Sequence, residues 1–575
     1  MTSTGVSAKQ VADVAIVGGG PVGLATALTL SHPPHNCHVC IVESNAMVNY
    51  YDPTKAFLYN VNQRGQRLTK KFPRLHKKLI DSSIESRGMM SNFMVVPGDP
   101  NLPLPGIDAN DSSSNSRKMS EVVNPGIEAT MKSTAAEEDD SKVSFWIPRH
   151  EMTRIMKEVV EEENEILENK SDDNNAGSIT VLFGMECMDV SPAISTLPDD
   201  YGIQVVVKNS TTEEISVYHC NLVVGADGYK STVRNSLGRT NKTSENKFHS
   251  HKSWPEIPLH KFKLKQYKSP ATGLRIKVLQ LPPQFEINNV NGTTYKTKGS
   301  FIYAIRGVNK KPTTYLGLGL LPVKDNNAVR PANIITRPNH ILWTLRTGEE
   351  LKEWFSKCFP RLNFSKMVCQ QEWDRLAQAE GTRFPHCQYS NGISLSSLDT
   401  RSGVVLVGDA IHSYPPDIGQ GVNSGLLDVL ALGEALTNVH LSSSSRQQAS
   451  MKSETLGDVS LGDALDKFER NRLKETRALV HLARIGAPYQ YNQPLRVDKL
   501  GKALWTINIL LRTILNKVSF GLIPPAAIQL TNQRPDLSFH QVMFRANLVT
   551  FGLGTVLSLL IKRIGLALWH LIIKK

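Results

Sequence analysis

Three glycines, Gly18, Gly20 and Gly23, follow the apolar run Val14 to Val17 and stand at the start of an expected helix. The first glycine permits a tight turn, the second lets a pyrophosphate approach the backbone, and the third lets helix and strand pack closely. Glu43 ends a second apolar run twenty residues after Gly23, where its carboxylate could accept a hydrogen bond from a ribose hydroxyl. This spacing predicts a βαβ unit that binds a dinucleotide.

Two later stretches have the same form, an apolar strand that ends in a turn with Gly and Asp. LVVGADGYKSTVR contains Asp227 and Gly228, and VVLVGDAIHSYPPDIGQGVNSG contains Asp409. The sequence has no second GxGxxG for a separate nicotinamide domain. The pair of turns therefore predicts FAD as the bound cofactor.

The second of these stretches also predicts how a flat ring is held. Gly419 and Gly421 would admit an isoalloxazine without clashes from Cβ atoms. A helix is expected to begin just after them, and the N–H groups of its first turn have no partner inside the helix. Such groups can stabilise negative charge that develops on a reduced flavin. His412 is expected to fill a hydrogen-bonding niche, not to act as an acid or base.

The three turns, in this order over residues 12–436, resemble the single-component flavoprotein monooxygenases of the para-hydroxybenzoate hydroxylase type. Within that family the chain is most similar to kynurenine 3-monooxygenase and kynurenine monooxygenase-like proteins, through FLYNVNQRGQRL (57–68), FWIPRHEM (145–152) and ETRALV (475–480), followed by a hydrophobic tail. The resemblance implies an α/β fold: a Rossmann-like FAD-binding domain of the GR2 type, an inserted antiparallel-sheet substrate domain, and a helical, hydrophobic C-terminal tail.

The resemblance also implies roles for individual residues. Glu43 would bind the adenosine ribose, Arg149 would lie near the pyrophosphate and the ribityl chain, and Asp409 would accept from a ribityl hydroxyl. Asp227 and Gly228 would be shared between FAD and NADPH, although an Asp that caps a turn for structural reasons is the alternative. Gly421, Val422 and Asn423 would line the pyrimidine edge of the flavin.

By the same resemblance, NADPH would reduce FAD, O₂ would add to give a flavin hydroperoxide, and an aromatic ring would be hydroxylated. Asn423 and Arg87 are the residues predicted to act directly in the reaction. Arg87, in SIESRGMMSNF, would orient a substrate carboxylate through its planar guanidinium; a surface arginine is the alternative. The chain has Asn471 to Lys474 where the family has a tyrosine-containing stretch, and Asp417 and Ile418 where animal enzymes have aromatic residues. Because of these two departures, kynurenine is only one candidate substrate.

Two other functions remain open at this stage. A flavin-dependent reductase or epoxidase that acts on isoprenoid lipid would suit the apolar tail. A prenyl-protein escort factor of related fold would bind partners without catalysis, and bound flavin would distinguish it from an enzyme.

Composition narrows the class of partner. The formal charge is +13, but Lys and Arg are spread along the chain without a dense stripe, so no nucleic-acid binding is expected. The seven cysteines are scattered and odd in number, and Cys37 and Cys40 lack a second ligand pair, so reduced thiols on the cytosolic side and no metal site are predicted.

The C-terminal tail predicts membrane attachment. Leu548 to Ile561 is apolar, Lys562 and Arg563 interrupt it, and 564–573 is apolar again. A span needs about 20 apolar residues. The whole stretch from Leu548 is long enough, but its two cations interrupt it, so a transmembrane helix and a helix lying in the interface are both left open. For the stretch 504–522 core packing is favoured over membrane contact. The catalytic part would face the cytosol, and the mitochondrial outer membrane is one candidate location.

The expected organisation follows from these elements. Polar stretches at 106–142, 161–177 and 441–457 are expected to be surface insertions. The FAD-binding domain would be built from 1–85, 143–250 and 396–480, with 86–142 on the substrate side, the substrate domain at 251–395, a helical region at 481–546 and the membrane anchor at 547–575.

Overall fold

The structure is a computed structural model, and it describes residues 10–46, 51–52, 57–87, 93–105, 143–169, 176–193, 202–239, 247–290, 292–311, 313–441, 459–491 and 496–573. The expected insertion at 106–142 lies outside the described residues. So does most of the stretch 441–457.

The stretch 161–177 differs from the prediction. Its first part, to Asn169, is the C-terminal end of helix α6 (Arg149–Asn169). Leu167 is buried there, and Glu163 pairs with His32 and Arg74. The charged residues that suggested an insertion are the outer face of an amphipathic helix.

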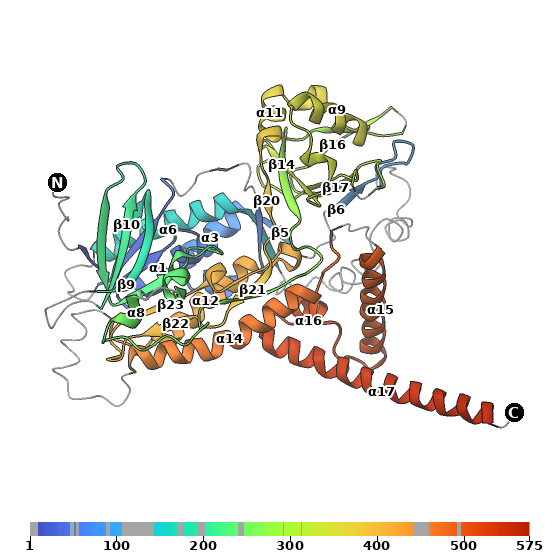
Figure 1. The fold of residues 1–575 in the computed structure, drawn as a ribbon. Helices are drawn as coiled ribbons and strands as arrows, with labels where there is room; N and C mark the ends of the chain where they lie inside the picture. Colours follow the sequence, from blue (N-terminus) through green and yellow to red (C-terminus); the bar gives the residue numbers. More distant parts are fainter. Residues whose placement is uncertain are drawn as a thin grey trace.

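The central sheet is the parallel sheet predicted from the glycine turns (Figure 1). Its strands pair in parallel except for the edge strand β22, which runs antiparallel to β23. Apolar runs such as VAIV are buried along their whole length, as expected for strands covered on both faces. In sheet order the strands are β22 (Ser394–Ser396), β23 (Gly403–Leu406), β12 (Leu222–Gly225), β2 (Val14–Val17), β3 (His38–Glu43) and β8 (Ser178–Phe183).

Helices α1 (Pro21–Ser31), α6 and α12 (Gly421–Leu436) pack around this sheet and share one hydrophobic core with it. A second sheet with the order β1–β11–β10–β9 belongs to the same core. Its strands are β1 (Gln10–Val11), β11 (Ile215–Cys220), β10 (Ile203–Asn209) and β9 (Met185–Pro192). The nucleotide-binding part is therefore assembled from segments far apart in the chain.

The expected inserted sheet forms a separate lobe with its own core, together with α9 (Gly348–Cys358) and α11 (Gln370–Gln378) (Figure 1). Most of its pairs are antiparallel, but the edge strand β6 runs parallel to β17. In sheet order the strands are β20 (Thr382–Arg383), β14 (Arg275–Leu281), β19 (Arg330–Thr336), β18 (Gly317–Leu320), β17 (Ile302–Arg306) and β6 (Phe93–Val96). The segment at 86–142 does contribute to this lobe, through β6.

Short sheets lie where the two parts meet. One has the order β4–β7–β5, formed by Leu58–Val61, Ser144–Pro148 and Ile84–Ser86, and the other has the order β13–β21–β24, formed by Leu264–Tyr267, Cys387–Ser390 and His412–Ser413. Strand β24 follows the Gly-Asp turn directly. The sheet β13–β21–β24 therefore links this turn to the segments that enter and leave the inserted lobe.

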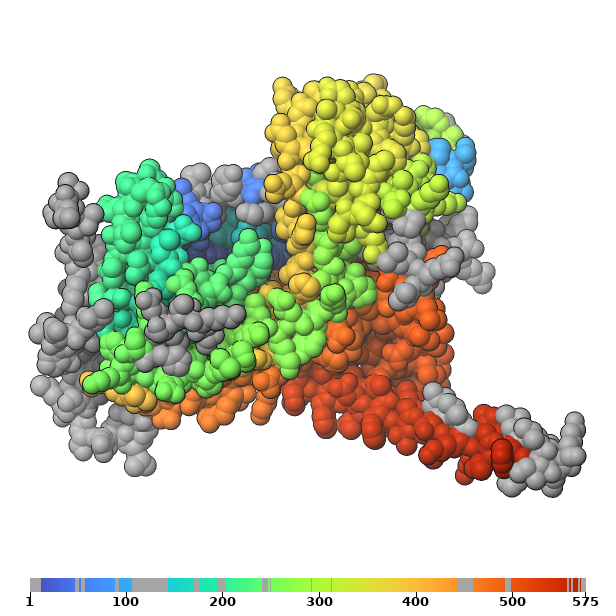
Figure 2. Space-filling view, viewed as in Figure 1, coloured from blue at the N-terminus to red at the C-terminus, as the bar shows by residue number. Residues whose placement is uncertain are grey.

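The C-terminal helices are α14 (Leu461–Ile485), α15 (Arg496–Val518), α16 (Ala527–Gln533) and α17 (Phe539–Ile573). Arg64 holds this region to the nucleotide-binding part, because its guanidinium donates to the carbonyls of Thr531, Arg534 and Leu537. Helix α17 begins in the core and then projects away from the body (Figures 1 and 2).

Two expectations for this region need correction. Within the described residues, no helix combines the length and the apolar content that crossing a bilayer requires, so the transmembrane reading of the tail is not supported. The stretch 504–522 packs only part of its apolar residues into the core: Ile509 is buried there, but Leu504, Leu511, Val518 and Leu522 are exposed. The side that faces the protein also carries the buried Arg512.

Candidate functional site

The three predicted turns meet at one edge of the central sheet. Gly18 follows β2, Glu43 ends β3, Ala226 follows β12 and Gly408 closely follows β23. Because these strands are parallel, their carboxyl ends share that edge, where open α/β sheets bind ligands. The first and third of these stretches also pack against each other. A Cβ on Gly425, at the end of the third stretch, would lie 2.6 Å from Cγ2 of Val22, in the first turn of α1.

The backbone geometry of the first turn agrees with the spacing of its glycines, and the contact with a pyrophosphate stays a prediction. Gly18 has φ +108°, and a Cβ there would lie 2.5 Å from the carbonyl oxygen of Ala226. A Cβ on Gly23 would lie 1.8 Å from the carbonyl oxygen of Gly18. By contrast, no described atom lies within 4 Å of a Cβ built on Gly20. The turn is thus tightly packed on the protein side and open where a pyrophosphate would approach.

Glu43 is tied to the glycine turn. Its Oε2 accepts a hydrogen bond of 2.6 Å from the backbone N–H of Gly19, and its Oε1 accepts one of 2.8 Å from the N–H of Asn45. The carboxylate is buried and therefore fixes the turn relative to β3. Its contact with a ribose stays a prediction.

Arg149, Tyr59 and Asp409 form a polar group beside the turns. Arg149 is the first residue of α6. Burial raises the pKa of Tyr59 in β4, and the nearby charge of Arg149 opposes this rise. The side chain of Asp409 is accessible to solvent, but protein atoms surround it. The resulting loss of hydration raises the pKa of its carboxyl, and the nearby His412 and Arg149 oppose this rise. An accessible acid with few protein partners suits the predicted bond to a ribityl hydroxyl.

The start of α12 is open in the same way as Gly20. Gly419 has φ +61°, and Cβ atoms built on Gly419 or Gly421 would meet no described atom within 4 Å. The first N–H groups of α12, those of Gly421, Val422 and Asn423, have no partner within the helix. A flat, electron-rich ring fits beside such a surface.

The side chain of Asn423 is bonded within the protein, and its role in the reaction stays a prediction. It is fully buried; its Oδ1 accepts from the N–H of Asn62, and its Nδ2 donates to the carbonyls of Asn60 and Gly419. These bonds fasten α12 to β4 and to the start of α2 (Gln63–Thr69). A contact with the flavin would therefore come from the backbone of Asn423.

A buried charge network that the sequence did not predict supports the Gly-Asp turn. Asp428 on α12 accepts from the N–H of Gly408 at 2.9 Å, contacts Nε2 of His412 at 2.9 Å and accepts from Nε of Arg472 at 2.8 Å. Burial would raise the pKa of Asp428, but Arg472 and His412 hold it below its ordinary value. His412 thus occupies the expected hydrogen-bonding niche.

Asp227 has the structural role that was weighed as an alternative. Its Oδ2 accepts from the N–H of Val233 and so caps α7 (Thr232–Gly238). Its Oδ1 has no partner among the described residues, and Gly228 has φ +78° with open space at its Cβ position. Arg234 donates to the carbonyl of Ala410 at 2.7 Å, which joins the second turn to the third.

Asp417 is the most unusual acid of the loop before α12. It is buried, and neither carboxylate oxygen has a partner among the described residues. Burial raises the pKa of Asp417 to about 8. Gln420, also buried, has an unpartnered Oε1 in the described part of the chain. The sequence marked position 417 as a departure from related enzymes but gave no signal of this burial.

Arg87 directly follows β5 and is about half exposed. Its Nε donates to Oε1 of Glu85 at 2.7 Å. The proposed carboxylate clamp therefore already has an acidic neighbour, with which a substrate carboxylate would compete. Its part in substrate binding stays a prediction.

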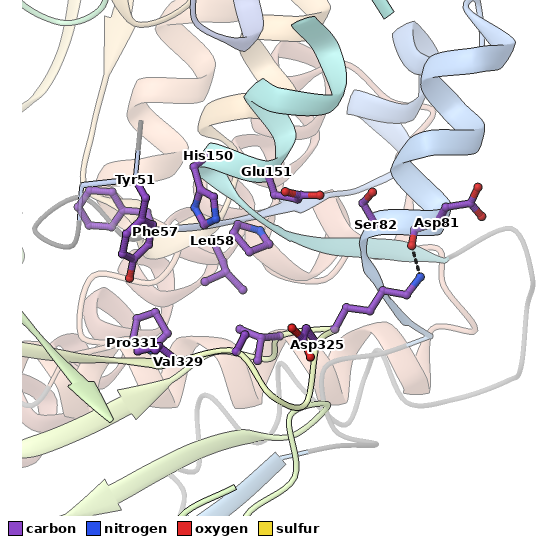
Figure 3. A pocket seen from close by; sticks show the side chains of 14 residues that line it. Tyr51, Phe57, Leu58, Asp81, Ser82, His150, Glu151, Asp325, Val329 and Pro331 are labelled. Carbon is purple, nitrogen blue, oxygen red and sulfur yellow. Dashed lines mark hydrogen bonds between the residues drawn. The ribbon is translucent and has the colours of Figure 1, made fainter. Parts of the chain in front are cut away.

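A pocket of about 570 Å³ lies between the nucleotide-binding part and the inserted lobe (Figure 3). Tyr51, Phe57 and His150 line one side, and Val329 and Pro331 line the other. None of its lining residues belongs to the three glycine turns, and its link to them is Arg149, which stands between the lining residues Pro148 and His150. Its size is ordinary for a small-molecule site.

The sequence matches the FAD binding domain family over residues 11–449. The chain belongs to this family. Its residues fit the cofactor, because Gly20, Gly228, Gly419 and Gly421 leave their Cβ positions open along one edge of the sheet, next to Asp409. FAD is accordingly the cofactor of this protein.

Two curated relatives are FAD-dependent monooxygenases by name. The protein spyC of Aspergillus fumigatus is 26% identical over 304 residues, which cover 51% of this chain and 53% of spyC. The protein cdmI of Talaromyces verruculosus is 27% identical over 99 residues, 17% of this chain and 20% of cdmI. The chain thus spans about half the length, or less, of the curated relatives it matches.

Among solved structures, p-nitrophenol 4-monooxygenase PnpA from Pseudomonas putida is 14% identical, with a TM-score of 0.49 over 89% of this chain and 98% of PnpA. PqsL, a probable FAD-dependent monooxygenase from Pseudomonas aeruginosa, is 16% identical, with a TM-score of 0.42 over 86% of this chain and 100% of PqsL. Neither curated relative is named as a kynurenine monooxygenase, and the finer resemblance stays a proposal.

Proposed function

We propose that this protein is an FAD-dependent monooxygenase that uses NADPH and O₂ to hydroxylate an aromatic substrate. The observation that carries the proposal is the meeting of the three turns at one sheet edge, with Arg149 and Asp409 beside them. Family membership and the names of the curated relatives support it.

FAD supplies the redox and oxygen chemistry, and the chain supplies binding and orientation. The open glycines of the first and third turns admit the cofactor backbone and ring. The N–H groups at the start of α12 favour negative charge beside them. The network around Asp428 fixes the turn that carries Asp409. These residues act by holding the reactants in place, and none is required as a nucleophile.

For the substrate, we propose an acidic aromatic compound of the kynurenine type. The pocket between the two parts has one aromatic wall and lies where ligands commonly bind. Arg87 would orient the carboxylate in competition with Glu85. Asp417 distinguishes this chain from the animal enzymes, because it places a buried acid where they have an aromatic ring, near the predicted flavin edge. We also propose that the C-terminal tail attaches the protein to a membrane with its catalytic part on the cytosolic side.

The decisive experiment measures NADPH consumption and hydroxylated product for the purified protein with kynurenine, anthranilate, hydroxybenzoates and isoprenoid lipids. An acidic aromatic substrate should give coupled product. NADPH oxidation that responds to lipid alone would support the epoxidase or reductase alternative. A protein that purifies without flavin and cannot be reconstituted with FAD would support the escort alternative.

A further inference from the structure

Helix α15 carries a continuous apolar stripe on its outer side. Its members are spaced alternately by four and three residues, so they lie on one face of the helix. Their exposed fractions range from 44% to 72%. The members are Leu500, Leu504, Ile507, Leu511, Ile514 and Val518.

The polar side of α15 faces the protein. Arg512 is buried, and it donates to the carbonyl of Ala546 at 3.2 Å and bonds the hydroxyl of Thr550, both on α17. Thr513 bonds Gln529 of α16. The side of α15 that faces the protein therefore holds bonded polar side chains next to the buried Ile509, while the apolar stripe points outward.

The turn after α15 extends this surface. Phe520 and Leu522 are 97% and 88% exposed, the highest values among the exposed large apolar residues described. The turn is held by its own hydrogen bonds, from Asn516 Nδ2 to the carbonyl of Ile523 at 2.7 Å and from the N–H of Ile523 to the hydroxyl of Ser519 at 2.9 Å. Phe520 has φ +50°, a conformation unusual for a bulky residue. The backbone thus presents both side chains outward.

Helix α17 adds exposed apolar residues at an angle to α15 (Figure 1), among them Leu548, Phe551 and Trp569. The whole region is strongly basic, because residues 496–575 hold eleven Lys and Arg but two Asp and no Glu. Exposed apolar residues beside many cations suit a surface that is both greasy and anionic. A second copy of the same basic region would be repelled.

We propose that α15 and the turn at 519–523 form a membrane-contact surface of their own, which lies in the interface of an anionic bilayer beside the tail. Two elements would then hold the protein to the membrane, and neither needs to span it. The hydroxyl of Thr550 on α17 bonds Arg512 on α15, and the tail projects from the body after this residue. Contact through α15 should therefore survive removal of the tail. This inference does not depend on the catalytic proposal.

A first test uses the full chain. Cys369 is the exposed cysteine among those described, so a Cys369→Ser background allows an environment-sensitive label at Phe520→Cys. Vesicles of phosphatidylcholine with 30% phosphatidylserine should shift its emission to the blue, and brominated acyl chains should quench it. The same label at Leu259→Cys, an exposed position beside the nucleotide-binding core, should not respond. A label at position 520 that stays in water while the protein floats with vesicles would overturn the proposal.

A second test removes the tail by ending the chain after Gly552. This shortened protein should float with the anionic vesicles, and Leu504→Gln, Ile507→Gln and Leu511→Gln together should lower the bound fraction at least tenfold. A matched triple variant, Ile215→Gln, Leu259→Gln and Leu398→Gln, changes residues of similar exposure elsewhere and should bind normally. Flavin content reports that each variant folds. Equal binding by both triple variants would refute the proposal, as would a dimer in light scattering that the α15 substitutions abolish while vesicle binding persists.

Discussion

Arg472 on α14 and Asp428 on α12 form a buried ion pair in which Nε of the arginine donates to Oδ1 of the aspartate at 2.8 Å. The other oxygen of Asp428 accepts from the N–H of Gly408. A helix from the end of the nucleotide-binding part is thus connected, through one carboxylate, to the turn that carries Asp409.

Replacement of Arg472 by Met should destabilise the protein by about 3–5 kcal/mol, because it leaves Asp428 buried without its main partner. Flavin content should fall as well, since the turn at Gly408 loses its support. Urea unfolding and the flavin absorbance of the purified protein measure the two effects. Arg470→Met, an exposed change on the same helix, is the control and should change neither. Unaltered stability of the Arg472 variant would mean that the pair contributes nothing.

Gly20 and Gly23 should respond differently to the same change. Gly20→Val should lower FAD occupancy strongly, while the apoprotein loses about 1 kcal/mol or less, since the added side chain enters open space at a helix start. Gly23→Val should unfold the apoprotein, because its Cβ would collide with the carbonyl of Gly18. Thermal unfolding with and without FAD separates the two. Equal effects would show that Gly20 does not face the cofactor.

Asp409→Ala should also lower FAD occupancy, but without loss of stability in the apoprotein, because burial already raises the pKa of this carboxyl and disfavours its charged form. Equilibrium binding of FAD to the apoprotein is the measurement. Full affinity in this variant would remove Asp409 from the cofactor site.

Asp417 should make stability depend on pH. Its pKa in the folded protein is about 8, above the unfolded value of about 3.9, so its contribution is fully present below about pH 4 and is lost as the pH rises toward 8. Asp417→Asn should therefore be more stable than the parent at pH 8, by a few kcal/mol at about 1.4 kcal/mol per pKa unit, and by only about 1.5 kcal/mol at pH 5. Urea midpoints at both pH values measure this, with the exposed Asp466→Asn as control. Parallel pH profiles for Asp417→Asn and the parent would refute the assignment.

Arg87 should act on the substrate and not on the cofactor. Arg87→Lys should raise KM for an acidic aromatic substrate, because the planar fork is lost, and Arg87→Ala should also uncouple NADPH oxidation from hydroxylation. Glu85→Gln should lower KM, since it removes the competing carboxylate. FAD content should be unchanged in all three. A neutral lipid as the true substrate, or unaltered KM and coupling in Arg87→Ala, would end the clamp hypothesis.

The part of the site that the sequence predicted is local. Gly18, Gly20 and Gly23 have their roles because a short segment needs particular backbone freedom next to a strand, and such needs are visible in the sequence. The side-chain partners of Asn423 and Arg472 could not be predicted from the sequence, because Asn60, Asn62 and Asp428 are brought near them by the fold.

The outer face of α15 shows a second limit. The apolar spacing from Leu504 to Val518 identifies an amphipathic helix, but it does not say which side meets the protein. Arg512 decides this, through acceptors on α17 that lie more than thirty residues further along the chain. An apolar stripe usually faces a core, and that expectation was wrong here because the polar side found buried partners.

The order of strands in the central sheet has a consequence for how the chain is made. Strand β12 pairs with β2 on one side and with β23 on the other, and β23 leaves the ribosome about 180 residues after β12. At translation rates of about 5–20 residues per second, β12 waits about ten seconds or more for its second neighbour. During that time this apolar, fully buried strand has one unpaired edge. We expect newly made chains to need a chaperone over this interval, and fusions that end before residue 403 to aggregate.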